Sequence, residues 1–198
     1  TLEEVQRNAM KINSLIHQVL NFNRIEDNED SLLILSRIEL VSFSHSLFSV
    51  YEEDKRLTFL FETNKAKIYA DMDAIKLGVI LDSLLSNAVK FTPDGGSIRL
   101  SLFYREETGL VDICVSDTGS GIPPRDIPYI FQRFFQSPHS GNKEGTGIGL
   151  YLVKTYTELH GGHITGVTSE EGKGTSVGLN IPVIAVEEEE IPATQEKK

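Results

Sequence analysis

The chain has 198 residues, of which 39% are hydrophobic and 24% charged, an ordinary composition for a globular protein with one sizeable core. Its net charge of −10 argues against a general nucleic-acid binder, and no basic cluster opposes that conclusion. The single cysteine, Cys114, excludes an internal disulfide. No apolar run approaches ~18 residues, so we expect no membrane span and no signal peptide within the chain.

The first part of the chain, residues 1–27, is predicted to form a helix. Its apolar residues recur at steps of three and four, which is typical of a coiled-coil seam. They are Leu2, Val5, Ala9, Ile12, Ile16 and Val19. A polar break follows, so we divide the chain into this helix, a folded domain at 28–186 and an acidic tail at 187–198. The tail has no apolar periodicity and is expected to be a linker or disordered.

The domain at 28–186 is expected to combine helices with short strands, because its apolar residues switch between helical and alternating spacing. Helices are predicted at 44–53, 73–90 and 148–160. Strands are predicted at 57–62, 67–70, 98–104, 110–117, 163–169 and 175–182.

The helix predicted at 73–90 carries two polar residues, Asn87 and Lys90, near its end. They are three residues apart and therefore share one face. An amide carbonyl oxygen suits Mg²⁺, and an ammonium group suits a phosphate. An ordinary amphipathic helix with a polar outer side explains the same pattern. These two residues alone therefore do not decide between a ligand site and an ordinary helix.

A glycine-containing turn, Asp117 to Ile122, follows directly on the strand predicted at 110–117. Gly119 and Gly121 let this turn pass close to a ligand. The carboxylate of Asp117 only accepts hydrogen bonds, and the exocyclic amine of adenine would be a suitable donor. The alternative is an aspartate that merely caps a glycine-rich turn.

A second glycine-rich segment, Gly145 to Leu150, leads straight into the helix predicted at 148–160. Backbone N–H groups in such a segment approach an anion closely, and the start of the helix adds its own unpaired N–H groups. Phosphate is the natural ligand of this arrangement. Taken alone, the segment is equally well explained as a common glycine-rich turn.

The three segments, in this order, resemble the ATP-binding domain of sensor histidine kinases, within the superfamily that includes gyrase, Hsp90 and MutL. They look like the N box and the two glycine boxes of that family. Between the glycine boxes, Ile130 to Phe135 looks like the F box, which points to the histidine kinases, and Gly172 to Thr175 matches the terminal Gly-Thr signature. The resemblance covers roughly residues 57–183. It implies a two-layer α/β sandwich of the Bergerat type, with a mixed, mostly antiparallel sheet against three helices.

The resemblance also implies that the site binds ATP and Mg²⁺. Asp117 would hold the adenine amine, and Phe91 with Ile122 would line the base. Asn87 would bind the metal, and Lys90 would meet the phosphates. The implied nucleotide-binding residues are Asn87, Lys90, Phe91, Asp117, Gly119, Gly121, Ile122, Gly145, Thr146, Gly147, Ile148, Gly149, Leu150 and Thr175.

Two further features bear on the nucleotide site. Many family members carry an asparagine four residues before the metal-binding one, and here that position is Ser83, to which we assign no role. The segment 137–144 resembles the ATP lid, because it has many loop formers and no periodicity. Lys143 and Arg133 are candidate phosphate partners there, although solvated surface charges explain them equally well.

The helix at 1–27 looks like the second helix of a kinase dimerisation and phosphoacceptor domain. None of the five histidines has the acidic-Arg-Thr-Pro context of an acceptor, and His160 is interpreted as a helix cap or a core histidine. The resemblance therefore implies transfer of the γ-phosphoryl group to a histidine outside this chain, and onward to a receiver-domain aspartate of a response regulator. It also implies that the whole protein is a homodimer anchored in the inner membrane, with this chain in its cytoplasmic part. A hybrid kinase is one form that such a protein takes.

Two alternatives stay open from the sequence. One is an ATPase of the gyrase or Hsp90 kind, against which the F-box-like segment and the absence of a glutamate before Asn87 both count, since Ser86 stands there. The other is a non-catalytic nucleotide-binding scaffold, for which the departure at Ser83 is the only support.

Overall fold

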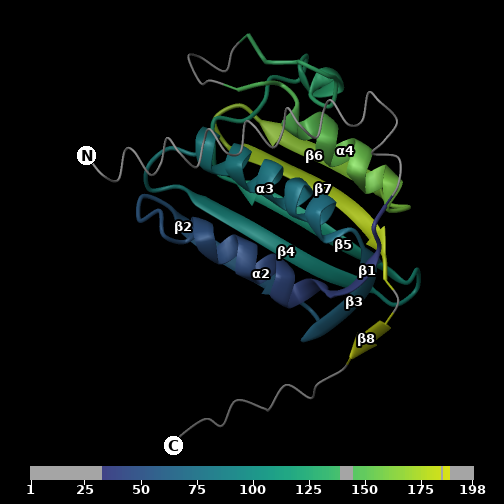
Figure 1. Cartoon of the computed structure of the whole chain (residues 1–198). Coiled ribbons are helices and arrows are strands. Elements are labelled where there is room, and N and C mark those ends of the chain that lie inside the picture. The colour runs from purple at the N-terminus through teal and green to yellow at the C-terminus, as the bar shows by residue number, and fades with distance from the viewer. Residues whose placement is uncertain (1–32, 139–144, 184, 188–198) are drawn as a thin grey trace, which may run out of the picture.

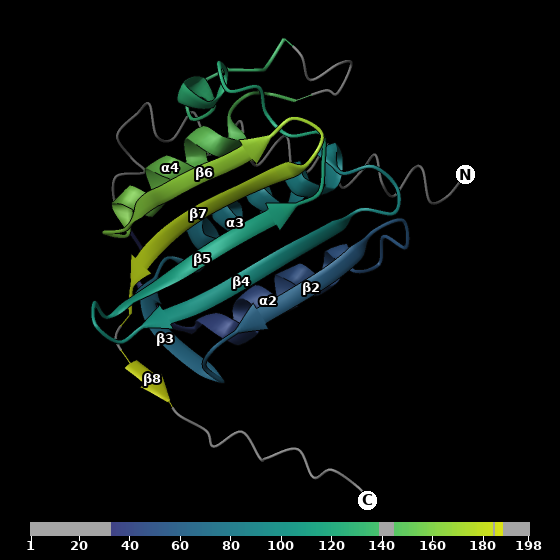
Figure 2. The ribbon, with the colours of Figure 1, turned by 180° about the vertical axis from the view of Figure 1, so that it is seen from behind.

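The computed structural model describes residues 33–138, 145–183 and 185–187. Its centre is a five-stranded sheet in the order β2-β4-β5-β7-β6, antiparallel except for the parallel pair β2–β4. Three helices cover one face of this sheet (Figure 1), and no helix covers the other face among the described residues (Figure 2). The sheet strands are β2 (Thr58–Thr63), β4 (Ser97–Arg105), β5 (Leu110–Asp117), β6 (His163–Glu170) and β7 (Gly174–Pro182), and the helices are α2 (Leu40–Tyr51), α3 (Ala74–Phe91) and α4 (Gly149–Leu159).

Strand β5 illustrates how sequence alternation builds the two layers. Val111, Ile113 and Val115 are buried, whereas the residues between them are half-buried on the uncovered face. Buried side chains at every second position must face the helices, because successive strand residues point to opposite sides of the sheet. The strand has the bounds predicted from this alternation, and the two-layer fold class is confirmed.

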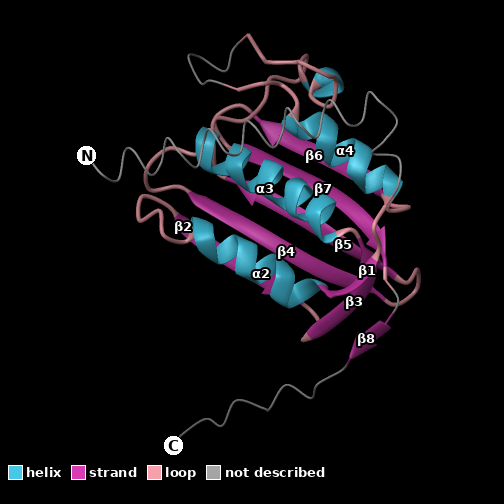
Figure 3. Cartoon of the chain, in the orientation of Figure 1, coloured by secondary structure: helices cyan, strands magenta, loops and turns pink. Residues whose placement is uncertain are grey.

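Helix α3 begins at a side-chain cap and ends where the predicted nucleotide site begins. Asp73 accepts hydrogen bonds from the N–H groups of Ile75 and Lys76 at 3.0 and 3.1 Å, which satisfies two free donors of the first turn. The helix buries its apolar face against the sheet and packs beside α4 (Figure 3). Asn87 and Lys90 therefore lie in its last two turns, as predicted.

A second, three-stranded sheet was not predicted. It has the order β1-β3-β8, formed by β1 (Ser36–Glu39), β3 (Lys67–Met72) and β8 (Ala185–Glu187). Strand β8 includes Glu187, which was expected to begin the tail. Strands β1 and β8 are held in place because they pair with the two edges of β3. Neither strand is long enough to show the alternation of apolar and polar residues that would predict it.

The first described helix also starts earlier than predicted, at Leu40 rather than Ser44. The carboxylate of Glu39 accepts hydrogen bonds from Val41 and Ser42, so an acidic residue caps the helix. Ser44 lies fully buried inside it.

Two predicted segments lie outside the described residues: the helix at 1–27 and all but the first residue of the tail at 187–198. Within the described part of the chain, no helix is both long and apolar enough to span a bilayer.

Candidate functional site: the ends of three strands and two helices

The C-terminal end of α3 meets the start of the second glycine-rich segment. A Cβ atom placed on Gly145 would lie 3.0 Å from Lys90 Nζ, and this ammonium also lies 4.8 Å from the ring centre of Phe91. Asn87 is half-buried one turn earlier, and its side chain has no hydrogen-bond partner among the described residues. The structure thus brings the predicted metal ligand, the predicted phosphate ligand and the glycine segment together.

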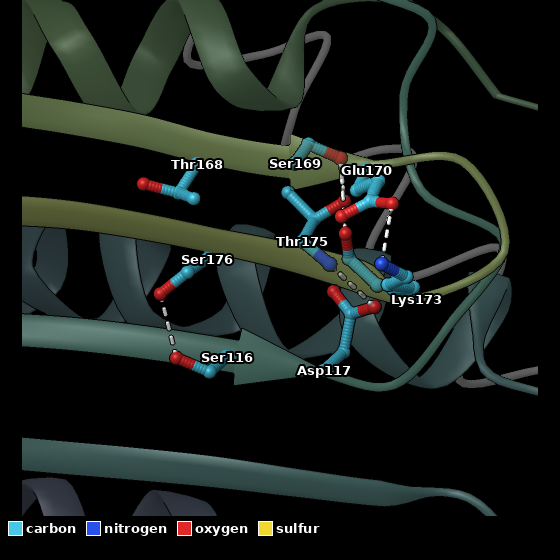
Figure 4. Close-up of a pocket in the computed structure, with 9 residues that line it drawn as sticks. Ser116, Asp117, Thr168, Ser169, Glu170, Lys173, Thr175 and Ser176 are labelled. Atoms are coloured by element: carbon cyan, nitrogen blue, oxygen red, sulfur yellow. Dashed lines mark hydrogen bonds and ion pairs between the residues drawn. The ribbon is translucent and has the colours of Figure 1, made fainter.

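Asp117 lies at the end of β5 and uses one carboxylate oxygen to hold the surrounding backbone. Its Oδ1 accepts a hydrogen bond from the N–H group of Gly119 at 2.8 Å. The same oxygen accepts from the N–H group of Thr175 at 3.2 Å (Figure 4). Its Oδ2 accepts none from the described residues, so one acceptor remains for a ligand. Burial raises the pKa of this carboxyl above its usual value, and the two N–H donors oppose that rise.

The first glycine box is fixed between α3 and the turn that joins β6 to β7. Ser120 N–H donates to the carbonyl of Phe91 at 3.1 Å, and Gly172 N–H donates to the carbonyl of Ser120 at 2.8 Å. Gly121 has a φ of 71°, and a Cβ atom there would collide with the Glu170 carbonyl. Only glycine fits this position without strain, and its lack of a side chain lets the turn run this close to its neighbours.

The second glycine box is joined to the F-box-like segment. Phe134 N–H donates to the Gly147 carbonyl at 2.9 Å, and Gln136 Nε2 donates to the Gly145 carbonyl at 2.8 Å. Gly147 has a φ of 70°, and a Cβ atom on it would lie 2.5 Å from the carbonyl carbon of Phe134. Phe134 itself has a φ of 61°, which is uncommon for an aromatic residue. The backbone strain and the close packing both concentrate where phosphate is expected to bind.

The N-terminus of α4 completes the predicted phosphate cradle. The helix has 11 residues from Gly149, and Ile148 before it is buried, so its first N–H groups have a fixed direction. A Cβ atom on Gly149 would lie 3.6 Å from Ser83 Cβ and Oγ. Ser83 is thus buried under the first turn of α4.

Of the two candidate phosphate partners near the lid, the structure describes only Arg133. Arg133 lies over the ring of Tyr151 at 4.8 Å, and its Nη2 donates to the Tyr151 hydroxyl at 2.9 Å. It is therefore held against the first turn of α4, beside the glycine box. Lys143 lies outside the described residues, as does the lid from 139 to 144.

Sequence reasoning missed Ser169, which organises the strand ends from β6. Its hydroxyl accepts from Ile122 N–H at 2.8 Å and lies 2.8 Å from Thr175 Oγ1. Ile122 and Thr175 are thereby tied to one residue, and Figure 4 shows Ser169 beside Thr175. A serine in an alternating strand gives no sign of this role, because the signal lies in the pairing of β6 with β7.

The donor set fits a small, hard cation that also contacts a nucleotide. Among the described residues, no group of three or more His, Cys, Asp or Glu side chains is placed to hold a metal. Mg²⁺ commonly takes one or two protein oxygens and fills its remaining positions with water and substrate phosphates. The half-buried amide of Asn87, beside Lys90, is consistent with that pattern.

Comparisons with known proteins agree with this geometry. Residues 72–185 match the family described as histidine kinase-, DNA gyrase B- and HSP90-like ATPase. The sensor histidine kinase WalK of Bacillus subtilis (strain 168) is 31% identical over 186 residues, which are 92% of this chain and 30% of WalK.

Two solved structures share the fold. The mycobacterial sensor histidine kinase MprB has a TM-score of 0.66 at 25% identity, covering 76% of this chain and 98% of its own. Full-length ShkA in complex with AMPPNP has a TM-score of 0.75 at 25% identity, covering 93% of this chain and 39% of its own.

The fold and the three connected motifs define an ATP-binding domain of the kind found in sensor histidine kinases. The chain belongs to the histidine kinase-, DNA gyrase B- and HSP90-like ATPase family. The family and fold expected from the sequence are thereby confirmed, and histidine kinase relatives favour that branch over the gyrase or Hsp90 alternative. The chain spans 30% of the length of WalK, so it corresponds to one part of such a protein.

Proposed function

We propose that this domain binds ATP with Mg²⁺ and transfers the γ-phosphoryl group to a histidine outside residues 1–198. The observation that carries the proposal is the meeting of two helix ends. The end of α3 brings Asn87 and Lys90 to the glycine segment that opens α4, with Lys90 Nζ 3.0 Å from the Cβ position of Gly145. A metal ligand, a cation and a row of N–H groups at one place suit a polyphosphate.

The adenine would lie toward the strand ends. Asp117 Oδ2 would accept the hydrogen bond of the exocyclic amine, while Oδ1 keeps the backbone of Gly119 and Thr175 in place. Phe91 and Ile122 would line the base. The N–H groups from Gly145 to Leu150 would hold the β- and γ-phosphates.

Asn87 would hold Mg²⁺ through its amide oxygen. When bound, the ion would supply positive charge that neutralises the phosphate oxygens. Lys90 would balance the charge of the same phosphates from the next turn of α3. The chain's contribution is to position the phosphates and to exclude water from them.

In the transfer step, a histidine ring nitrogen would attack the γ-phosphorus from the side opposite the β–γ bridging oxygen. The new N–P bond forms as that P–O bond breaks, and ADP leaves with the bond's electron pair. The phosphoryl group would then pass to a receiver-domain aspartate of a response regulator. We further propose that the whole protein is a homodimer anchored in the inner membrane with this domain in the cytoplasm.

A calorimetric titration of the chain with ATP, in Mg²⁺ and again in excess EDTA, tests the binding proposal. We expect ATP to bind more tightly with Mg²⁺. GTP should bind at least about tenfold more weakly, because its ring carbonyl would face the Asp117 carboxylate and leave it without a donor. Equal affinity for ATP and GTP would contradict the adenine assignment, and no binding of either would contradict the function.

A further inference from the structure

Helices α3 and α4 are attached to each other near both ends of α4, and only one of those two places belongs to the proposed nucleotide site. At the site end, Ser83 lies under Gly149, and Lys90 lies beside Gly145. At the opposite end, Asp73 caps the start of α3, and its N–H donates to Nε2 of His160, the C-cap of α4, at 3.0 Å. The two helices therefore run antiparallel and are fastened at the end remote from the phosphates.

The hydrogen bonds of His160 fix its protonation state. Its Nδ1 lies 2.6 Å from the Tyr156 carbonyl, which only accepts, so Nδ1 carries the proton. Its Nε2 receives the Asp73 N–H and must therefore be unprotonated. Both ring nitrogens are satisfied only in this one neutral tautomer.

The surroundings of the ring are polar but enclosed. His160 is 8% exposed, and Asp73 and Lys76 form an ion pair at 3.3 Å beside it. Asp73 also accepts from Ile34 N–H at 3.1 Å, and Lys76 Nζ lies 5.6 Å from the ring centre of Tyr156. One buried group of side chains thus connects the backbone of Ile34 with the start of α3 and the end of α4.

We propose that His160 is a positioning residue for the nucleotide site, holding α4 at a fixed place along α3. The inference rests on the proposed function. The two points of attachment on α3, Asp73 and Ser83, are ten residues apart, or about 15 Å along the helix axis, so α3 acts as a stiff rod between them. Without the hydrogen bond between Asp73 and His160, α4 loses its attachment at that end and is free to shift along α3. The N–H groups at the start of α4 then move relative to Asn87 and Lys90.

Protonation of His160 should have the same effect as removing it. A proton on Nε2 would face the Asp73 N–H, placing two donors against each other. Burial lowers the pKa of His160, with Lys76 adding to the effect, while the Tyr156 carbonyl and Asp73 oppose it. Because the folded-state pKa is lowered, the hydrogen bond is fully present above about pH 6.5, the ordinary value, and breaks as the pH falls through the folded-state pKa.

The test compares the parent with His160→Gln, His160→Leu and the control His163→Gln, by titration with ATP and Mg²⁺ between about pH 5 and pH 8. Glutamine can present an oxygen near the Nε2 position but cannot become charged, whereas leucine offers no acceptor. His163 is a neighbouring histidine on β6 whose ring contacts Asn180 at 3.2 Å, away from α3. Thermal unfolding of each variant reports on folding separately.

At neutral pH we expect His160→Gln to bind ATP within about twofold of the parent and His160→Leu to bind roughly fivefold or more weakly. As the pH falls, the parent and His163→Gln should lose more affinity than His160→Gln. Protonation of ATP itself is common to all of them and cancels in the comparison.

Superimposable pH profiles for the parent and His160→Gln would overturn the inference, and this comparison does not depend on whether His160→Leu folds. A folded His160→Leu variant with parental affinity would overturn it as well. In either case the parent still binds ATP at neutral pH, so the proposed function would stand. A parent that fails to bind ATP would instead refute the function on which the inference rests.

Discussion

Asp117 holds the turn after β5 with Oδ1, because the N–H groups of Gly119 and Thr175 both donate to that oxygen. Two such bonds favour the ionised carboxylate, whereas burial favours the protonated form and raises its pKa. The charge of this group is therefore lost at a higher pH than that of an exposed aspartate. Near pH 7 the carboxylate remains an acceptor with one oxygen left over.

Replacing Asp117 with Asn should weaken ATP binding while the fold persists. The amide oxygen can still accept from the two backbone donors, which leaves the NH₂ group facing the adenine amine, donor against donor. Losing a charge-assisted hydrogen bond costs ~1.5–3 kcal/mol, or roughly ten- to a hundredfold in affinity. Calorimetric titration with ATP at neutral pH in Mg²⁺ measures this loss of affinity.

Asp112→Asn is the matched control for this substitution. Asp112 lies on the same strand and pairs with Arg105 on the face that none of the described helices covers. We expect its ATP affinity to stay within about twofold of the parent. An Asp117→Asn affinity equally close to the parent would rule out the adenine assignment.

At this scale the sequence identified the residues that come together at the candidate site better than the residues that support them. Asp117 and the glycines stand in local motifs, so their residue types and spacing were visible. Ser169 and the buried His160 act through partners that are distant in sequence, Ile122 and Asp73. Such partners become neighbours only after the strands and helices are packed, and no local pattern records them.

Helix α3 illustrates what can be predicted about an element. Its broad apolar face predicted the helix within one residue at each end, with Asp73 counted in the helix although it is the N-cap in the structure. Helix α2 was predicted to start four residues too late, and in the structure Glu39 caps its true start. Strands β1 and β8 exist only through their pairing with β3, so their short sequences could not predict them.

The position of Asn87 on α3 leads to a metal-specific prediction. Asn87→Ala should reduce ATP affinity more in Mg²⁺ than in EDTA, because an amide oxygen is a hard ligand suited to Mg²⁺. We expect roughly a tenfold loss with metal, similar to that of a hydrogen bond to a charged group, and less than about threefold without it. Paired calorimetric titrations give both values.

Ser86→Ala controls for changes to the helix itself. Ser86 precedes Asn87, and its hydroxyl donates to the Ser83 carbonyl at 3.4 Å, within the helix. Loss of the Ser86 hydroxyl should lower the ATP affinity slightly, and by the same factor with and without Mg²⁺. If Asn87→Ala also loses the same factor with and without Mg²⁺, Asn87 supports the helix end rather than the metal.

At the scale of the whole molecule, we expect ATP to bind in one place and its phosphoryl group to be accepted in another. The proposed nucleotide site lies where the ends of β5 and β7 meet the facing ends of α3 and α4, all within the family domain at 72–185. The same architecture closes the described histidines to such a role. His45 packs edge-on against Phe61 at 5.0 Å, His160 is buried at the far end of α4, and His163 contacts Asn180.

We therefore predict that the 198-residue chain binds ATP but does not phosphorylate itself. In-line transfer requires the attacking nitrogen within ~3–3.5 Å of the phosphorus and aligned with the bond that breaks. The described histidines are held elsewhere by their neighbours, and His17 and His139, outside the described residues, lack the acidic-Arg-Thr-Pro context of an acceptor. Incubation with γ-labelled ATP and Mg²⁺ should leave the chain unlabelled. A separate domain that carries such an acceptor helix should become labelled when added. An acid-labile, base-stable label on the chain alone, absent from His17→Gln, would identify His17 as the acceptor and contradict this prediction.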